Sequence, residues 1–248
     1  MNEKYWDRVA EDYDNRIFDT LKNDRKGTIR RHINRYSSGK TTAYDFGCGV
    51  GKYLAVLRRR FEAIHAIDIS ARCLEIARNN CQGIGNITFL KHDLSDPDFN
   101  LGKTDFAISV NVLIMPSYEI RAGILNTISR HLVKGGNLLL VVPSLESALY
   151  SNFRLQEWNR RSSRNHRDKF YFKFDGNNAS IVRGVLNWAD RSTKHYLEAE
   201  LRTQLAAVGL EVIGSEKVEY SWDSMFDTPP SWMQQPYPWD WLTVSRKH

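Results

Sequence analysis

The sequence predicts an α/β protein built on a mainly parallel β-sheet. Short apolar runs alternate with segments of helical spacing between residues 41 and 143, and such alternation produces parallel sheets joined by right-handed helical crossovers. A glycine-rich turn follows the first apolar run, and two further strand-like runs lie near the carboxyl terminus. With 248 residues, the chain suffices for one main core and an appendage.

The first half of the chain reads as alternating strands and helices. Residues 41–46 predict a strand, a tight turn follows, and residues 52–61 have the spacing of a helix. Ser70 is placed to cap a helix over residues 71–81, because a serine side chain can accept hydrogen bonds from the first free amides of a helix. Further strands are predicted over residues 63–70, 86–94, 104–115 and 137–143, and a further helix over residues 118–132, ending at the turn KGG, 134–136.

The alternation breaks after Pro143. Residues 144–190 are first polar and basic and then alternate apolar and polar side chains, which predicts an inserted hairpin or small antiparallel cover. Helical spacing resumes over residues 194–208. Two closing strands are predicted over residues 210–222 and 238–247, and the proline-rich connection between them is long enough to suggest a functional role.

The stretch YDFGCGVGKY, residues 44–53, places three glycines within five residues. A P-loop would need four residues between its glycines and a serine or threonine after the lysine, whereas Tyr53 follows Lys52. The dinucleotide fingerprint GxGxxG would need its third glycine at position 52, and here that glycine comes one residue early. Glycines at such a turn let the main chain approach a ligand without Cβ clashes.

The spacing of Asp45, Gly47, Gly49 and Gly51 resembles the D/E-x-G-x-G-x-G signature of class I S-adenosylmethionine-dependent methyltransferases. The resemblance implies a Rossmann-like three-layer α/β/α sandwich. Its seven-stranded, mostly parallel sheet would have an antiparallel last strand, with an inserted cover after the fifth strand. The implied cofactor is S-adenosyl-L-methionine, with S-adenosyl-L-homocysteine as product.

This resemblance extends over about residues 5–143 and again from about residue 195 to the end, and it divides the chain into three parts. Residues 1–40 are expected to form an N-terminal helical lid. Residues 41–143 and 191–248 would form the cofactor-binding core, and residues 144–190 a substrate-side cap.

The resemblance also implies cofactor contacts at the ends of the predicted strands. Asp68 follows Gly51 by seventeen residues, where a carboxylate can accept hydrogen bonds from both ribose hydroxyls. Asp93 would face the adenine amino group, and Asp45 would meet the ammonium group of the cofactor. A helix-capping role for Asp68 and a turn role for Asp93 are the alternatives. The implied set is Tyr13, Asp45, Gly47, Cys48, Gly49, Gly51, Asp68, Ile69, Asp93, Leu94 and Asn111.

Four members of this set have other expected roles. Leu94 could pack on the adenine ring, and Asn111 lies where the family receives the methionine portion of the cofactor. Tyr13 corresponds to a tyrosine that closes over the cofactor, with an apolar helix stripe against the sheet as the alternative. Cys48 is predicted to fill space rather than act as a nucleophile, since no neighbouring base is evident.

Methyl transfer from a sulfonium is an in-line displacement with a good leaving group. Holding two reactants in that geometry lowers a barrier by roughly 7–11 kcal/mol, which makes a dedicated base optional. His195 is the candidate base because it precedes the returning helix, and a surface histidine at a helix start is the alternative. The cysteines have no metal-ligand spacing, and no metal site is predicted.

Aromatic residues near the carboxyl terminus indicate what kind of molecule accepts the methyl group. Four of the seven tryptophans fall within the last 27 residues: Trp222, Trp232, Trp239 and Trp241. Apolar walls of this kind suit an aromatic or hydrophobic small molecule, with packing of the last strands or a dimer contact as the alternative. We therefore predict a methyltransferase acting on a small-molecule substrate.

Other classes of function remain open. The net charge is +6, and Arg160, Arg161, Arg164 and Arg167 make the insertion a candidate docking surface for RNA or protein, so a nucleic-acid partner is a less favoured alternative. A non-catalytic cofactor-binding regulator and a nicotinamide redox enzyme are further alternatives. Three cysteines, which cannot all pair within one chain, and a charged amino terminus predict a cytoplasmic protein without a membrane partner. No oligomeric state is predicted.

Overall fold

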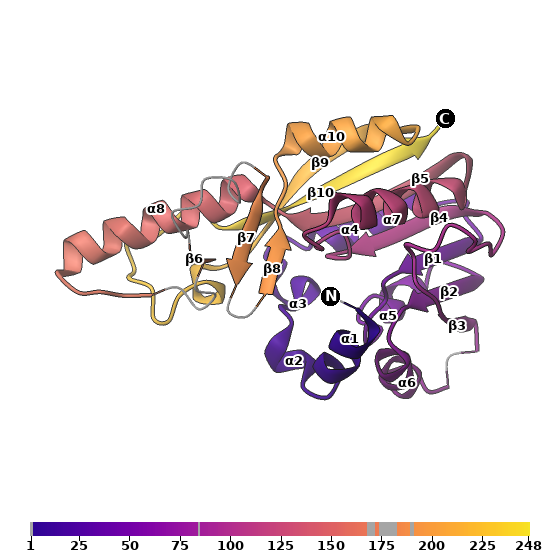
Figure 1. Cartoon of the computed structure of the whole chain (residues 1–248), viewed down its shortest axis with the longest axis horizontal. Coiled ribbons are helices and arrows are strands. Elements are labelled where there is room, and N and C mark those ends of the chain that lie inside the picture. The colour runs from indigo at the N-terminus through magenta and orange to yellow at the C-terminus, as the bar shows by residue number, and fades with distance from the viewer. Residues whose placement is uncertain (1, 84, 168–171, 174–182, 189–190) are drawn as a thin grey trace.

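The computed structural model of the chain describes residues 2–83, 85–167, 172–173, 183–188 and 191–248. Its centre is a seven-stranded sheet in the order β3-β2-β1-β4-β5-β10-β9 (Figure 1). The strands are β1 (Thr42–Phe46), β2 (Ala63–Asp68), β3 (Ile87–Lys91), β4 (Thr104–Val110), β5 (Leu132–Pro143), β9 (Leu210–Glu219) and β10 (Trp239–Lys247). Strand β10 is antiparallel to both neighbours, while β1 to β5 pair in parallel. The predicted mostly parallel sheet with an antiparallel last strand is confirmed.

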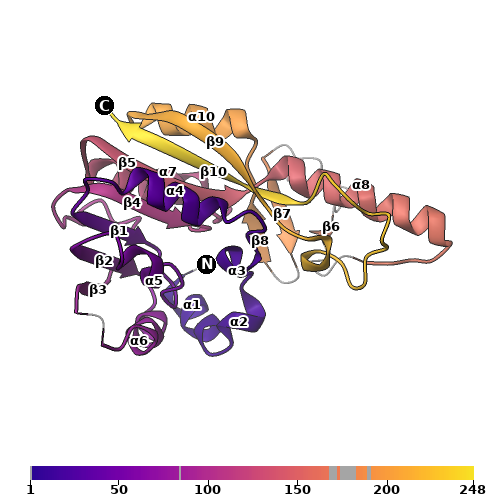
Figure 2. The same cartoon turned by 180° about the vertical axis from the view of Figure 1, so that it is seen from behind.

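Helices cover both faces of this sheet, as the view from behind also shows (Figure 2). One face carries α4 (Thr28–Tyr36), α5 (Leu54–Leu57) and α6 (Ala71–Asn80), and the other carries α7 (Tyr118–Arg130) and α10 (Glu198–Ala207). Because side chains alternate along a strand, Ala43 and Phe106 pack with the first set of helices, whereas Tyr44 and Ala107 pack with the second. The result is the predicted three-layer α/β/α sandwich.

Several element boundaries differ from those predicted. Helix α5 is shorter than expected because turns occupy residues 49–53 and 58–60. Strand β4 ends at Val110 instead of residue 115, since Asn111 has a φ of 54°, outside the extended region.

The turn predicted at residues 134–136 lies inside β5, and α7 ends earlier, at Arg130. Pairing of β5 with β4 jumps here from Leu132 to Asn137. The two glycines of the turn therefore form an irregularity within the strand and do not cap the helix.

The insertion after β5 contains a long helix that the sequence did not predict. Helix α8 (Leu145–Ser162) projects from one end of the sheet (Figures 1 and 2). Two small polar residues on its buried side, Ser147 and Ser151, interrupt the apolar period that would have revealed it. In the described part of the chain, no helix combines the length and the apolar character needed to span a bilayer.

A three-stranded antiparallel sheet follows α8, made of β6 (Phe172–Lys173), β7 (Val185–Trp188) and β8 (Arg191–Lys194). It corresponds to the predicted cover, of which residues 168–171, 174–182 and 189–190 lie outside the described residues. After β8, Tyr196 forms a parallel bridge with Ser144. Because the chain is extended there, α10 begins at Glu198 and not at residue 194.

Segments near both ends of the chain form additional structure beside the sheet. The amino-terminal residues form α1 (Glu3–Ala10), α2 (Tyr13–Arg16) and α3 (Thr20–Asn23), and α1 packs on α6. The connection between β9 and β10 starts with the 3-10 helix η1 (Trp222–Ser224). Phe226 and Met233 of this connection pack with Trp158 of α8, so the projecting helix is tied to the end of the chain.

Candidate functional site

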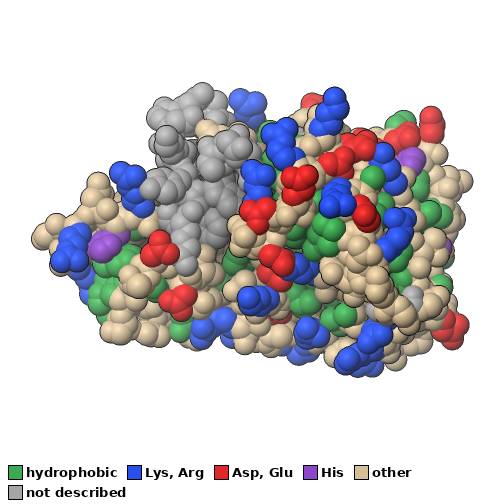
Figure 3. Space-filling model, turned by 90° about the horizontal axis from the view of Figure 1, so that it is seen from below, with side chains coloured by type: hydrophobic (Ala, Val, Ile, Leu, Met, Phe, Trp, Pro, Cys, Tyr) green, Lys and Arg blue, Asp and Glu red, His purple; other side chains and the backbone are tan. Residues whose placement is uncertain are grey.

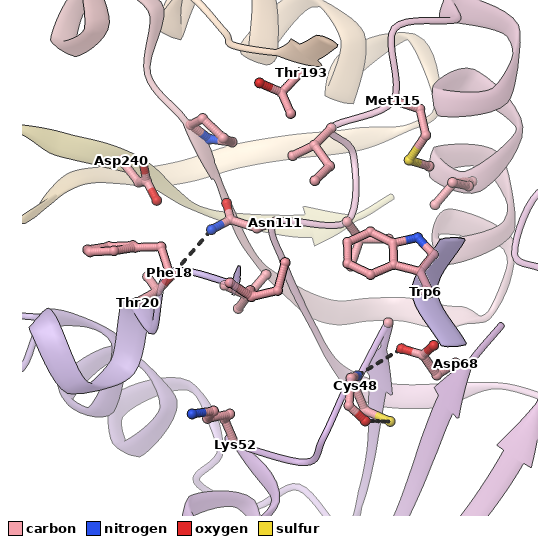
Figure 4. A pocket seen from close by; sticks show the side chains of 18 of the residues that line it. Trp6, Phe18, Thr20, Cys48, Lys52, Asp68, Asn111, Met115, Thr193 and Asp240 are labelled. Carbon is pink, nitrogen blue, oxygen red and sulfur yellow. Dashed lines mark hydrogen bonds between the residues drawn. The ribbon is translucent and has the colours of Figure 1, made fainter. Parts of the chain in front are cut away.

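A cavity of about 390 Å³ lies where the carboxyl ends of the parallel strands meet the amino-terminal helices (Figure 4). Open α/β sheets bind ligands at this edge. Asp45 of β1, Asp68 of β2 and Asn111 after β4 all line the cavity. So do the other predicted cofactor residues except Gly51, and so does His195. The structure therefore brings together almost the whole predicted set.

The glycine loop is shaped largely by the protein's own packing. Gly47 has a φ of +75°, and a Cβ there would lie 2.2 Å from a methyl carbon of Val112. Gly51 has a φ of +82° and faces Ala77 of α6, which explains why it does not line the cavity. A Cβ on Gly49 would lie 2.5 Å from the Tyr13 hydroxyl. Neighbouring side chains therefore also require these glycines, while Gly47 and Gly49 line the cavity and Gly51 does not. Contact of the loop with a cofactor stays a prediction.

Asp68 joins the glycine loop to the start of α6. Its carboxylate accepts a hydrogen bond from the Gly49 amide at 2.8 Å (Figure 4) and another from the Ser70 amide at 2.9 Å. Burial raises the pKa of Asp68, and these backbone hydrogen bonds oppose the shift. A carboxylate offers about four acceptor positions, so the backbone amides do not use all of them. As predicted, Ser70 caps α6 through the Cys73 amide.

Within the described part of the chain, a buried carboxylate oxygen and a buried amide oxygen in the cavity lack a protein partner. One is Asp45 Oδ2, on a residue only 1% exposed, and the other is Asn111 Oδ1. Burial, together with the charge of Asp68, raises the pKa of Asp45 to about 8. The Asn111 amide nitrogen donates to Thr20 Oγ1 at 3.2 Å, which holds α3 against β4. Since buried polar groups in native proteins are paired, these oxygens indicate a ligand that donates hydrogen bonds.

Tyr13 and Cys48 complete the loop side of the site. Burial raises the pKa of the Tyr13 hydroxyl far above its ordinary value, so Tyr13 stays neutral. Burial also raises the pKa of the Cys48 thiol, which fits the predicted space-filling role because the thiolate is the reactive form. Lys52 bridges Asp14 and Asp19 at 2.5 and 2.7 Å and thereby fastens α2 and α3 beside the loop.

The end of β3 supplies a mixed wall. Leu94 is buried, and Asp93 is exposed with one carboxylate oxygen accepting from the Ser95 amide and hydroxyl at 2.8 and 2.7 Å. Both line the cavity, as does Ile69 after β2. Trp6 of α1 lies on the same side as Asp68 (Figure 4). Trp6 is not among the residues that the sequence predicted to contact the cofactor.

The opposite end of the cavity holds groups that sequence reasoning missed. Asp240, the second residue of β10, lines the cavity and accepts a hydrogen bond from the Tyr220 hydroxyl at 2.7 Å. Burial raises the pKa of Asp240 to about 7, against the effect of hydrogen bonds from Tyr220 and Asn111. A carboxylate between Trp239 and Trp241 was the available signal. Burial lowers the pKa of His195 to about 4, so its imidazole is neutral at physiological pH.

The strand order, the glycine loop and the strand-end carboxylates define the class of protein. The fold is that of class I S-adenosylmethionine-dependent methyltransferases. Residues 43–136 match the family model described as a methyltransferase domain, so this chain contains a domain of that family.

Known proteins of this class resemble the chain over parts of their length. The methyltransferase nsrG of Aspergillus novofumigatus is 36% identical over 73 residues, covering 29% of this chain and 28% of that protein. A demethylmenaquinone methyltransferase of Tropheryma whipplei is 29% identical over 139 residues, 55% of this chain and 56% of its own. The chain thus matches about half the length of these curated relatives or less.

Among solved structures, magnesium protoporphyrin IX methyltransferase from Synechocystis, with bound S-adenosylhomocysteine, aligns with a TM-score of 0.60 at 18% identity. The alignment covers 100% of this chain and 96% of that one. At this identity, the likeness shows a common fold.

Proposed function

We propose that the protein is an S-adenosylmethionine-dependent methyltransferase that acts on an apolar small molecule. The observation that carries the proposal is the pair of unpartnered acceptor oxygens, Asp45 Oδ2 and Asn111 Oδ1, in a cavity that Asp68 also lines. The amino-acid portion of the cofactor carries an ammonium group, and its ribose carries two hydroxyls. A donor-rich ligand of this kind fits acceptors that the protein leaves unpaired.

Different residues would bind different parts of the cofactor. Asp45 and Asn111 would hold the amino-acid portion, Asp68 the ribose, and Ile69, Asp93 and Leu94 the adenine. When bound, the cofactor supplies a methyl group on a positively charged sulfur. Tyr13 and Trp6 exclude water from above the loop, and the cavity walls hold the acceptor in line with the methyl carbon. Positioning of this kind can account for much of the rate acceleration.

The concave, largely apolar site supports a small acceptor. Ile114, Met115, Met225 and Trp239 line it, and sites for small molecules are concave and mostly apolar. The relatives include methyltransferases named for demethylmenaquinone and for magnesium protoporphyrin IX, which favours the same conclusion.

A macromolecular acceptor has less support. Arg161 on α8 pairs with Glu157 at 2.5 Å and stacks over Trp232, with its guanidinium carbon 4.2 Å from the ring centre. Arg154 also pairs with Glu157. Basic and acidic side chains are interspersed over the face seen in Figure 3. RNA binding through phosphates would weaken steeply with added salt, and we expect no such binding in a salt titration.

Calorimetry with S-adenosylhomocysteine tests the cofactor site. We expect Asp68→Ala to weaken binding by about 10- to 100-fold, because a hydrogen bond to a charged group contributes roughly 1.5–3 kcal/mol. Asp98→Ala, in an exposed loop, is the matched control and should bind like the wild type. Tighter binding of NAD than of S-adenosylhomocysteine, or an Asp68→Ala variant with unchanged affinity, would refute the proposal. Binding without methyl transfer to any acceptor would indicate a regulatory protein.

A further inference from the structure

The far end of the cavity contains a polar group in an apolar setting. Asp240 pairs in register with Pro143, the last residue of β5, so it sits at the edge of the sheet where the parallel strands end. In Figure 4 it lies on the Asn111 and Thr20 side of the cavity, away from Asp68 and Cys48. Asp240 is thus separate from the groups assigned to the ribose and adenine.

The charges around the cavity indicate the charge of the acceptor. The described lining residues include five carboxylic acids: Asp19, Asp45, Asp68, Asp93 and Asp240. The only ammonium group among these lining residues belongs to Lys52, which is already paired with Asp14 and Asp19. The lining histidines add little, since the His195 imidazole is neutral and His92 lies 3.2 Å from Asp96. An anionic acceptor would meet repulsion here, whereas a neutral hydrogen-bond donor would meet an acceptor.

We propose that Asp240 accepts a hydrogen bond from a hydroxyl group of the methyl acceptor and takes up its proton during transfer. The acceptor is then a neutral, ring-bearing, hydroxylated apolar compound, held between Asp240 and walls that include Met115, Met225 and Trp239. This inference rests on the proposed function.

The proposed step balances in atoms and charge. A lone pair of the acceptor oxygen forms the new bond to the methyl carbon, and the bond between that carbon and sulfur breaks with its electron pair remaining on sulfur. The hydroxyl proton passes to the Asp240 carboxylate. The positive charge on sulfur and the negative charge on Asp240 disappear together, so the products are a neutral thioether, a methyl ether and a protonated carboxyl.

Asp240 suits this task better than His195. A base works best when its pKa lies near the working pH, and that of Asp240 is raised to about 7 while that of His195 is lowered to about 4. The Tyr220 hydroxyl, donating at 2.7 Å, acts as a positioning residue that fixes which carboxylate oxygen faces the acceptor.

Calorimetry on the complete protein saturated with S-adenosylhomocysteine tests the proposal with two probes of one shape, 1-naphthol and 1-naphthoate. We expect 1-naphthol to bind and 1-naphthoate to bind at least ~10-fold more weakly, because only the first can donate to Asp240 without bringing a negative charge. In Asp240→Asn the affinity for 1-naphthol should fall about 10-fold and the difference between the probes should narrow. Affinity for S-adenosylhomocysteine should fall by less than the affinity for 1-naphthol, because Asp240 is linked to the proposed cofactor residues only through its hydrogen bond with Asn111.

Methyl transfer to 1-naphthol gives a second readout. Asp240→Asn should lower kcat by about 10²- to 10⁴-fold, the usual contribution of a general base. Tyr220→Phe should raise KM more than it lowers kcat, as expected of a positioning residue. Equal or tighter binding of 1-naphthoate, no binding of 1-naphthol, or equal losses of naphthol and cofactor affinity in Asp240→Asn would overturn the inference. Failure of the wild-type protein to bind S-adenosylhomocysteine would instead refute the proposed function.

Discussion

Asp45 combines nearly complete burial with an oxygen that accepts no hydrogen bond from the protein. With a pKa raised to about 8 by burial and by Asp68, it is mostly protonated at neutral pH in the free protein. A neighbouring ammonium group favours the ionised form. Binding of the cofactor should therefore release a proton from this residue.

We predict that affinity for S-adenosylhomocysteine rises with pH between about pH 6 and pH 8, by at most ~10-fold per unit. The sign follows from the raised pKa: the free protein holds the proton up to about pH 8 and the complex does not, so binding becomes easier as pH increases. Calorimetry in two buffers of different ionisation enthalpy would count the released proton. Asp45→Asn should bind more weakly and lose this dependence, and a wild-type affinity that is flat over this range would contradict the assignment.

At the scale of elements, the loop between β1 and α5 depends on close packing. Gly47 would place a Cβ 2.2 Å from Val112, in addition to having a φ of +75°. Gly39 lies in the turn before β1 with a similar φ of +71°, yet a Cβ there would meet nothing within 4 Å. Alanine substitutions at these two glycines therefore separate the free-energy cost of the left-handed backbone conformation from the cost of the clash with Val112.

We predict that Gly39→Ala lowers the free energy of unfolding by about 1–2 kcal/mol, the usual cost of a left-handed conformation. Gly47→Ala should cost roughly 1–3 kcal/mol more, because Val112 must move, and it should also weaken cofactor binding. Urea denaturation of both variants measures the difference. An equal loss of unfolding free energy in the two variants would mean that packing against Val112 does not determine the conformation of the loop.

For the whole molecule, α8 projects from one end of the sheet, and its carboxyl-terminal half is anchored by the cluster that contains Trp158 (Figure 1). Trp158 of α8 is 7% exposed and packs with Trp222, Phe226 and Met233. Phe153, on the same helix, is 58% exposed. The projecting part should therefore unfold locally when its anchor is removed, since regions with few core contacts open separately.

Trp158→Ala should remove roughly 3–5 kcal/mol of packing energy from this cluster. We predict that amide hydrogen exchange accelerates at least ~100-fold in α8 and in residues 222–238, while the amides of β1 and β4 keep their protection. Phe153→Ala is the control and should leave exchange nearly unchanged. Acceleration throughout the sheet would indicate that α8 is an integral part of the core.

The amino-acid sequence by itself determined the sandwich and predicted most of the proposed cofactor side. Asp45, Gly47, Gly49 and Asp68 lie at the ends of β1 and β2 or in the loop between β1 and α5, so each is positioned by the element next to it. Local spacing is therefore enough to find them. Helix α8 was not predicted because small serines, and not apolar residues, occupy positions on its buried side.

Only the tertiary structure decided the proposed acceptor side. Tyr220 and Asp240 lie 20 residues apart in the chain, and they meet because β9 and β10 are antiparallel neighbours. The same pairing of β9 with β10 places Trp239 in the cavity, whereas Trp222 lies in the cluster with Trp158 of α8. No local pattern records such a meeting, since it depends on which strands lie side by side in the folded sheet.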